Sequence, residues 1–381
     1  MNKNILLVLT LVLAGFSANS HAHHARKLAK NLYKEAVASP AVPGISVAVA
    51  DNTGLKWSKG FGYADLENKV PMTAKTKLRI GSIAKVITAA GLMRLYEQGK
   101  INLNTDIREL VTAWPDKHEP ITLNHLTSHT SGIRHYASYA EFFSNVPYET
   151  TTEALNIFKD DNLLFSPGSD FRYTTFGWTL IGAVMEQADG QKTFKDIISE
   201  QVLTPLKLEN TTFDDKTPLI SHRQRPYSYY DGQLHNSPQV DSSYKYAGGG
   251  FLSTPNDIVS FALAHLRTDY LQNNTLAKMF TKSQRPDGSQ NPVGIGWFVG
   301  FDDELAWAKQ DPEKNAKLIR IMEEHPHTVS HSGGSVGGTS MLILCLEHER
   351  AVTVVKNVDG DDSADVFALA LETLDIFHHG H

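Results

Sequence analysis

The chain has 381 residues, enough for a large buried core in one or two domains, and its composition (41% hydrophobic, 20% charged) excludes a disordered or fibrous protein. The formal net charge of −6 gives no sign of a nucleic-acid surface. A single cysteine, Cys345, excludes an internal disulfide framework and a cysteine-rich metal site.

The first 22 residues have the pattern of a secretory signal peptide. Lys3 gives a positive start, residues 5–16 form an apolar run, and Ser20-His21-Ala22 places small residues where a signal peptidase cleaves. The run is short for a bilayer span, and an uncleaved anchor is the alternative. We therefore expect residues 1–22 to be removed, leaving a periplasmic or secreted protein that starts near His23 and has no membrane span.

The two ends of the mature chain have strand patterns, whereas the middle is mainly helical. Hydrophobic periodicity and turn residues predict helices over 25–38, 82–98, 152–159, 175–187, 195–201, 255–266 and 364–377, and strands over 45–50, 55–62, 294–300, 328–332, 340–346 and 351–357. A charge-rich segment, 302–324, interrupts the last strands. We expect it to be a solvated helical excursion, with a lid or an assembly element as the alternative.

These elements predict one α/β (α+β) domain over residues 23–381. An antiparallel sheet, built from about 23–80 and 291–381 and flanked by the terminal helices, would pack against a mostly helical lobe over about 81–290.

Two Ser-x-x-Lys sequences differ in their surroundings. Ser242-Ser243-Tyr244-Lys245 runs into Ala247-Gly248-Gly249-Gly250, where a regular helix is not expected. Ser82-Ile83-Ala84-Lys85 instead begins a helix that is apolar almost all round, with Lys85 as its only charge before Arg94. Only the first sequence therefore suggests chemistry.

Lys85 lies one helical turn after Ser82, so the two side chains share a face. Burial would push the lysine toward its neutral form, which makes it a general base for the serine hydroxyl. The helix N-terminus would favour negative charge developing at Ser82. The alternative is an N-cap serine beside a lysine that reaches solvent.

Two further segments contain residues suited to a cleft. Tyr173 precedes an apolar helix, where a phenol can relay protons, although an ordinary half-buried aromatic residue fits equally well. His331-Ser332-Gly333-Gly334 ends a predicted strand. A backbone N–H there could complete an oxyanion hole with that of Ser82; the alternative is a plain strand-to-turn junction.

Taken together, Ser82-x-x-Lys85, Tyr173 and His331-x-Gly333 resemble the serine β-lactamase and penicillin-binding-protein superfamily, in particular its class C-like members. The resemblance covers nearly the whole mature chain. It includes the segments 61–68, 78–82, 126–133 and 247–254, and the segments 131–136, 173–177 and 240–245 are closest to the mitochondrial serine β-lactamase-like branch.

The resemblance implies a β-lactamase/transpeptidase-like fold and a serine hydrolase of peptide, amide or ester bonds. Lys85 and Tyr173 would take the proton of Ser82, the N–H groups of Ser82 and Gly334 would hold the oxyanion, and an acyl-enzyme would form. His331, Thr175, Ser332 and Gly333 are the other expected site residues, the first with a catalytic role and the rest in substrate or oxyanion binding.

Two departures argue against antibiotic hydrolysis. Relatives carry Tyr-x-Asn where this chain has Tyr173-Thr174-Thr175, and a cationic Lys-Thr-Gly where it has His331-Ser332-Gly333. His331 would be mostly neutral at pH 7. We therefore keep a β-lactamase or D-Ala-D-Ala carboxypeptidase only as an alternative. A second alternative is a non-catalytic binding or filament-forming protein.

We expect no metal, no organic cofactor and no nucleic-acid partner. The ligand would be a small molecule or peptide, and a homo-oligomer or filament is left open. His125 and His129 have helical i, i+4 spacing but lack the glutamate of His-Glu-x-x-His. Cys345 is expected in the core, and His378, His379 and His381 in a frayed end.

Overall fold

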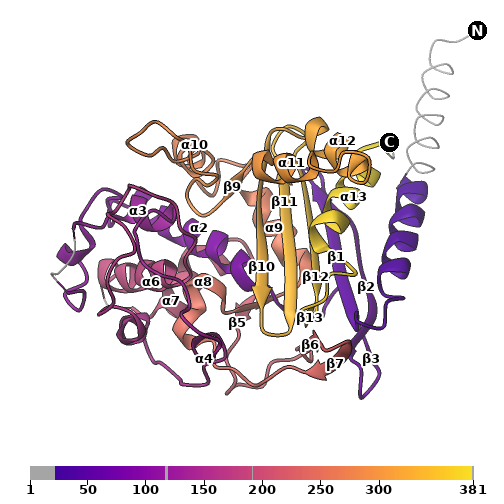
Figure 1. Ribbon diagram of the computed structural model, residues 1–381, viewed down its shortest axis with the longest axis horizontal. Coiled ribbons are helices and arrows are strands. Elements are labelled where there is room, and N and C mark those ends of the chain that lie inside the picture. Colours follow the sequence, from indigo (N-terminus) through magenta and orange to yellow (C-terminus); the bar gives the residue numbers. More distant parts are fainter. Residues whose placement is uncertain (1–21, 116–118, 191, 380–381) are drawn as a thin grey trace, which may run out of the picture.

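The computed structural model describes residues 22–115, 119–190 and 192–379. Its centre is a seven-stranded sheet in the order β3-β2-β1-β12-β11-β10-β9, with every neighbouring pair antiparallel (Figure 1). The strands are β1 (Gly44–Asp51), β2 (Gly54–Asp65), β3 (Val70–Pro71), β9 (Phe298–Val299), β10 (Thr328–Ser335), β11 (Gly338–Cys345) and β12 (Arg350–Lys356). Both ends of the chain thus contribute to one sheet, as the sequence predicts.

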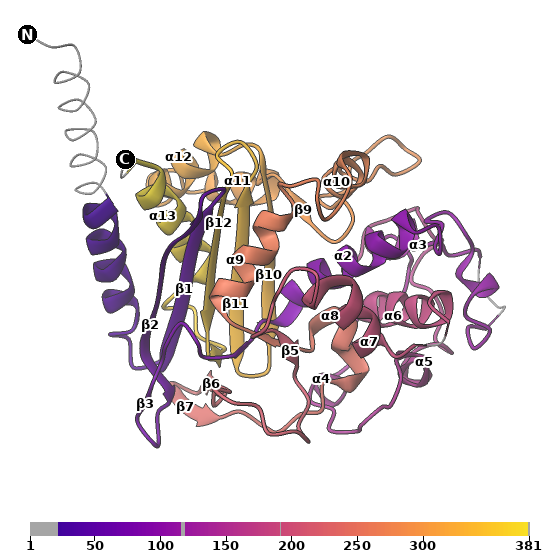
Figure 2. The ribbon, with the colours of Figure 1, turned by 180° about the vertical axis from the view of Figure 1, so that it is seen from behind.

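Helices cover both faces of this sheet, which explains why β1 is buried along its whole length. A helix over 22–36 and α13 (Val366–His379) cover one face, where the Tyr33 hydroxyl lies 2.7 Å from that of Thr373. α9 (Pro255–Ala264) covers the other face, as the opposite view shows (Figure 2). The predicted sheet with flanking terminal helices is confirmed.

The helical lobe packs against the edge of the sheet that carries β10 (Figures 1 and 2). At its centre lies α2 (Ala84–Glu97), which is buried on nearly every side, as its apolar sequence predicts. The other helices of this lobe are α3 (Leu123–Thr127), α4 (Tyr139–Phe142), α5 (Thr151–Ala154), α6 (Phe176–Ala188), α7 (Phe194–Ile198), α8 (Tyr246–Gly249) and α10 (Asn273–Met279).

Two small sheets connect the lobes. One contains β4 (Leu78–Arg79), β8 (Phe251–Ser253) and β5 (Thr212–Phe213), and the other contains β13 (Val358–Asp359), β6 (Tyr227–Tyr230) and β7 (Gln233–Asn236). β4 directly precedes the first Ser-x-x-Lys sequence, so its pairing with β8 fixes where that sequence begins.

Several predicted elements differ from the structure. The strand over 294–300 is reduced to the two residues of β9, because Gly296 and Gly300 have positive φ values of 78° and 73°. The helix over 152–159 is only α5 followed by a short 3₁₀ turn. Residues 246–249 form α8, so the expectation of no helix there was wrong.

The charge-rich segment forms α11 (Asp302–Ala308) and α12 (Ala316–Glu324), so it is helical as expected. It is not simply solvated, because Ile321 and Met322 are buried in the core beneath α13. His378 and His379 continue α13 and are not frayed, since the helix packs along the sheet. His381 lies outside the described residues.

The predicted signal peptide, residues 1–22, lies outside the described residues except for Ala22. Among the helices that the structure describes, none combines the length and hydrophobicity of a membrane span.

Candidate active site

Ser82 lies in a tight turn between β4 and α2, and this turn packs against the end of β10. The turn is a 3₁₀ helix over Gly81–Ile83, so α2 begins two residues later than the sequence predicts. Gly81 has φ +50°, and a Cβ there would lie 2.7 Å from the carbonyl oxygen of Gly334. Glycine therefore allows the Ser82 backbone to approach β10.

Ser82 is not the N-cap of the helix that follows it, because the N-cap positions of the 3₁₀ turn and of α2 are Ile80 and Ile83. Its hydroxyl instead lies 3.1 Å from Nζ of Lys85. The predicted pair is therefore in contact, and the alternative of an N-cap serine does not describe this turn.

Lys85 is fully buried, and Nζ also contacts Oγ1 of Thr175 at 3.2 Å and the carbonyl oxygen of Gly248 at 2.6 Å. Burial, aided by the positive charge of Lys245, lowers the pKa of Lys85 well below its ordinary value. A neutral amine fits these partners: it donates two hydrogen bonds, to Gly248 and Thr175, and its lone pair accepts the proton of Ser82.

Tyr173 lies beside this pair, with its ring centre 4.9 Å from Nζ of Lys85. Burial raises the pKa of Tyr173, and a hydrogen bond with Ser82 opposes the rise only partly. The phenol is therefore protonated at neutral pH.

Two histidines that the sequence analysis did not assign to the site hold Tyr173 in place. The His129 ring stacks on Tyr173 at 4.4 Å, and the His135 ring meets it edge-on at 5.8 Å. Their Nδ1 atoms accept the amide N–H groups of Thr174 and Thr175, each at 3.1 Å. Burial lowers the pKa of both histidines, to about 4 for His135, so both act as neutral acceptors.

His331 is buried and does not line the cleft, although its ring packs 6.4 Å from that of Tyr173. Its Nδ1–H donates to the carbonyl of Ser332 at 2.6 Å. Burial lowers its pKa to about 3, so it is neutral at pH 7, as the sequence analysis expects. The structure therefore places His331 behind the site and gives it no charge to offer a substrate.

Gly333 and Gly334 play different parts in β10. A Cβ on Gly333 would lie 2.1 Å from the carbonyl oxygen of Ile80 and 2.3 Å from Oγ of Ser340, so this position requires glycine. Gly334 and Ser332 line the cleft, and a Cβ on Gly334 would meet nothing within 4 Å.

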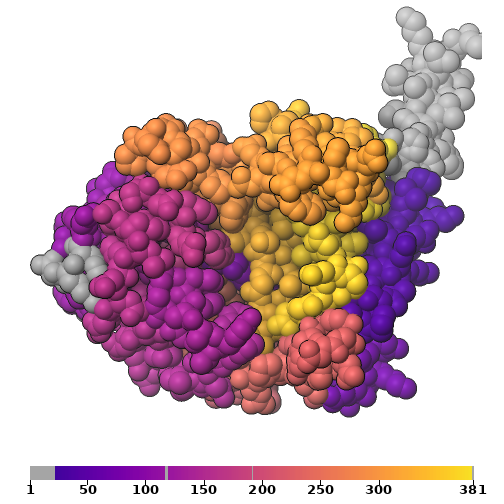
Figure 3. Space-filling model, in the orientation of Figure 1, coloured from indigo at the N-terminus to yellow at the C-terminus, as the bar shows by residue number. Residues whose placement is uncertain are grey.

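The cleft above Ser82 has a volume of about 450 Å³. It lies between the helical lobe and β10, where the space-filling view is hollowed (Figure 3). Its aromatic walls are formed by Tyr136, Phe142, Phe171, Tyr173 and Phe298. A larger hollow of about 800 Å³ is lined by other residues, His125 among them, and does not reach Ser82.

Lys245, from the Ser-x-x-Lys sequence that we set aside, also lines this cleft. Its ammonium group lies over the Phe142 ring at 4.9 Å, and burial lowers its pKa to about 8, which leaves it mostly charged at pH 7. The hydroxyl of Ser242 instead donates to Asp214 at 3.2 Å. A lysine just before a run of three glycines, Gly248-Gly249-Gly250, was the signal that could have identified this position.

His125 and His129 do not converge. Nδ1 of His125 accepts the Thr122 amide N–H at the start of α3, whereas His129 stacks on Tyr173. The convergent groups of metal-ligand type in the described part of the chain include no residue that lines the cleft.

The chain is similar to several known proteins. The family model described as Beta-lactamase matches residues 29–375. The human mitochondrial serine beta-lactamase-like protein LACTB is 29% identical over 400 residues, which cover 83% of this chain and 71% of the relative.

Two solved structures share the fold. The octameric penicillin-binding protein homologue from Pyrococcus abyssi has a TM-score of 0.73 at 25% identity, covering 92% of this chain and 77% of that one. The D-amino acid amidase from Ochrobactrum anthropi has a TM-score of 0.75 at 21% identity, covering 93% and 98%.

Proposed function

The chain belongs to the β-lactamase family of serine hydrolases, and we propose that it cleaves amide or ester bonds, including peptide bonds, through an acyl-enzyme on Ser82. The observation that carries this proposal is the contact of 3.1 Å between the Ser82 hydroxyl, which lines the cleft, and Nζ of Lys85. Lys85 is buried and its pKa is lowered. The resemblance that the sequence predicts is confirmed at the level of the family.

In the acylation step, the bond from Ser82 Oγ to the substrate carbonyl carbon forms as the hydroxyl proton moves to Nζ of Lys85. Gly248 and Thr175 hold the amine with its lone pair toward Ser82. General base catalysis of this kind contributes about 10²–10⁴ in rate.

The negative charge that develops on the carbonyl oxygen needs donors at the start of α2. The backbone N–H groups of Ser82 and Gly334 are our candidates, because the close approach of Gly81 to Gly334 brings these two backbone segments together. Preorganised donors are worth about 3 kcal/mol each in related sites.

The leaving group needs a proton to depart, and Tyr173 is suited to supply it. Its phenol is protonated at neutral pH and lies beside both Ser82 and Lys85. The Lys85 ammonium then returns a proton to the phenolate. Water attacks the acyl-enzyme by the reverse route and releases the product.

The walls of the cleft suggest a substrate with apolar or aromatic flanks and an acidic group. Aromatic side chains provide the apolar surface, and Lys245 provides the positive charge that His331 does not. We therefore expect Lys245→Met to raise KM for substrates with a carboxylate and to leave KM of neutral analogues nearly unchanged.

Mass spectrometry after incubation with a fluorophosphonate probe, and separately with a library of amides and esters, tests the acyl-enzyme. We expect label on Ser82, none in Ser82→Ala, and normal labelling in Ser242→Ala, the control from the second Ser-x-x-Lys sequence. An unlabelled but folded wild-type protein would favour the non-catalytic alternative. Rapid turnover of a chromogenic cephalosporin would favour the β-lactamase or D-Ala-D-Ala carboxypeptidase alternative.

We also propose that the protein acts in the periplasm or is secreted, after removal of residues 1–22. The charge and apolar pattern of that segment supports this, whereas the human relative is mitochondrial by name. The mass of the protein purified from its native host tests it: a chain that starts near His23 is expected, and a chain that retains residues 1–22 contradicts it.

We also propose self-association, since one structure with the same fold is octameric by its title. Light scattering of the purified chain distinguishes a homo-oligomer or filament from a monomer.

A further inference from the structure

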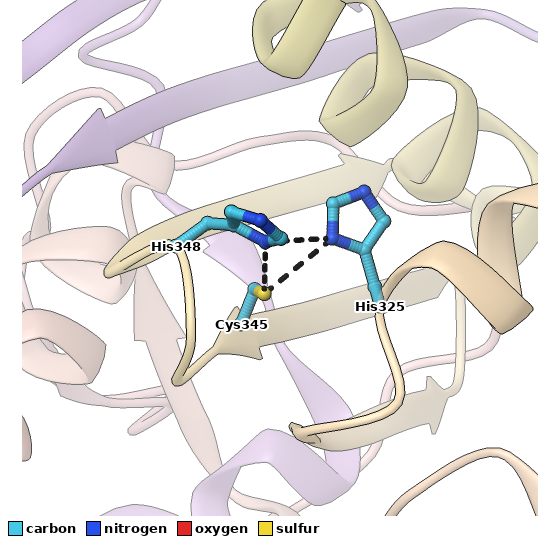
Figure 4. A group of neighbouring side chains, drawn as sticks. All are labelled: His325, Cys345 and His348. Carbon is cyan, nitrogen blue, oxygen red and sulfur yellow. Dashed lines mark hydrogen bonds between the residues drawn. The ribbon is translucent and has the colours of Figure 1, made fainter.

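Three potential metal ligands meet on the far side of the sheet from α9. Cys345 ends β11, His348 lies in the turn between β11 and β12, and His325 follows α12 (Figure 4). Cys345 and His325 are fully buried and His348 is half-buried. None of the three takes part in the proposed hydrolysis.

The three ligand atoms lie within contact distance of one another. Nδ1 of His325 is 3.2 Å from Nδ1 of His348, and Sγ of Cys345 is 3.5 Å and 3.2 Å from these two nitrogens, respectively. A triangle of this size places its corners about 2 Å from a common point, the length of a zinc–nitrogen bond.

The three observed separations can also be compared with those expected between the ligands of a tetrahedral zinc ion. Zinc–nitrogen bonds of about 2.0–2.1 Å and zinc–sulfur bonds of about 2.3 Å place two nitrogens about 3.3 Å apart and a nitrogen and a sulfur about 3.5 Å apart. The three observed separations agree with these values to within about 0.4 Å.

Ordinary two-centre hydrogen bonds do not account for all three contacts. An imidazole nitrogen either donates or accepts, and the thiol carries a single proton. Three ordinary two-centre hydrogen bonds are therefore impossible here, and the three contacts need either shared, three-centre hydrogen bonds or a bound cation. A bound cation accepts a lone pair from all three atoms at once.

A further histidine lies next to the triangle. The His378 ring, from the last turn of α13, lies 4.2 Å from that of His348 and 4.9 Å from that of His325.

A second group nearby, Glu324, Asp375 and His379, differs in kind. Arg320 contacts both of its carboxylates, at 2.7 Å and 2.8 Å, and so supplies the positive charge that a cation would bring. This second group lies toward the helix surface, and we propose no metal site there.

We propose that Cys345, His325 and His348 bind one Zn²⁺ ion. On binding, the thiol loses its proton to solvent as the zinc–sulfur bond forms, and the two imidazoles contribute lone pairs without losing protons. Sulfur and nitrogen ligands in a tetrahedral arrangement select zinc over magnesium or calcium, which prefer oxygen.

The ion would be structural. It would join the end of α12 to the turn between β11 and β12, and so attach the helical segment 302–324 to the sheet. The next strand after His325 is β10, whose opposite end carries the Ser332–Gly334 segment of the cleft. The proposal does not depend on the proposed hydrolysis, because no ligand lines the cleft.

Cobalt titration tests the site, because Co²⁺ occupies zinc sites and reports its ligands by absorption. The probe is Co²⁺ added to the full chain without an affinity tag, after removal of metal by a chelator. We expect one equivalent to bind with intense tetrahedral d–d bands and a thiolate-to-cobalt charge-transfer band, and Zn²⁺ to abolish both.

Three variants assign the ligands. Cys345→Ser should remove the charge-transfer band, and His348→Gln, in a half-buried turn, should weaken Co²⁺ binding at least tenfold. His379→Ala, an exposed neighbour outside the triangle, should bind as the wild type does. Circular dichroism confirms that each variant is folded before titration.

Binding without a charge-transfer band would overturn the proposal, as would equal affinity of His348→Gln and wild type. Failure of the folded wild-type chain to bind Co²⁺ or Zn²⁺ at micromolar concentration would also overturn it. Zinc that raises the thermal midpoint of wild type and His379→Ala but not of His348→Gln would support it by a readout independent of absorption.

Discussion

Gly333 offers a sharp test of how β10 positions Ser82. A methyl group in Gly333→Ala would lie 2.1 Å from the carbonyl oxygen of Ile80, two residues before the nucleophile, and 2.3 Å from Oγ of Ser340. Both neighbours are held: the Ser340 hydroxyl donates to that same Ile80 carbonyl at 2.8 Å. The substitution therefore pushes β10 away from the turn that carries Ser82.

The expected magnitude follows from these distances. Relieving a contact of 2.1 Å requires a backbone displacement of about 1 Å, and overpacking of this kind lowers the free energy of unfolding by about 1–3 kcal/mol. A displacement of about 1 Å in a catalytic geometry lowers the rate by about 10²-fold. We expect both effects in Gly333→Ala.

Urea unfolding measures the first effect, and the rate of Ser82 labelling by a fluorophosphonate measures the second. Gly334→Ala is the matched control for stability, because its methyl group would meet nothing within 4 Å; its free energy of unfolding should stay within about 0.5 kcal/mol of wild type. Adding Ser340→Ala to Gly333→Ala removes the 2.3 Å contact but leaves the one to Ile80, so the rescue should be partial.

A Gly333→Ala protein as stable and as readily labelled as wild type would refute this account of the strand. Equal destabilisation by the two alanine variants would also refute it, because a methyl group that meets nothing within 4 Å would then cost as much as one that clashes.

Three further substitutions test the chemistry of the cleft. Ser82→Ala should abolish turnover and labelling yet change the free energy of unfolding by less than about 1 kcal/mol, because Ser82 is not a helix N-cap. Calorimetry measures the stability and labelling the activity, and residual turnover would exclude Ser82 as the nucleophile. Tyr173→Phe keeps the stack on His129 but removes the phenolic proton, so kcat/KM should fall about 10²–10⁴-fold at near-wild-type stability. An unchanged kcat/KM would exclude Tyr173 as the group that relays the proton. In the pH profile of kcat/KM, the acid limb reports the deprotonation of Lys85 and should lie below the ordinary lysine pKa. Lys245→Met removes a neighbouring positive charge, raises the pKa of Lys85 and should move this limb to higher pH; a shift in the opposite direction would contradict the assignment of the base.

The local part of the site could be predicted from the sequence because it depends on helix geometry. One turn separates Ser82 from Lys85, and the apolar residues around Lys85 had to be buried, so contact and a lowered pKa both follow from sequence spacing. The alternation and turn residues of β1 and β2 likewise determined one hairpin of the sheet.

Other elements could not be predicted because long-range contacts decide them. The strand expected over 294–300 shortens to β9 where glycines with positive φ turn the chain, and the stretch over 246–249 is helical despite its glycines because it packs under Lys85 and Thr88. Intrinsic helix propensity has little effect on the local structure when tertiary packing opposes it.

The sequence alone determined the fold family and indicated the candidate serine, base and phenol, since these occur in recognisable local motifs. Only the tertiary structure decided that Lys245 supplies the positive charge of the cleft, that His129 and His135 hold Tyr173, and that His331 stays behind it. It also decided that His325 and His348 meet Cys345. The physical reason is that such contacts join residues brought together by sheet pairing and helix packing, and neither periodicity nor spacing along the chain records them.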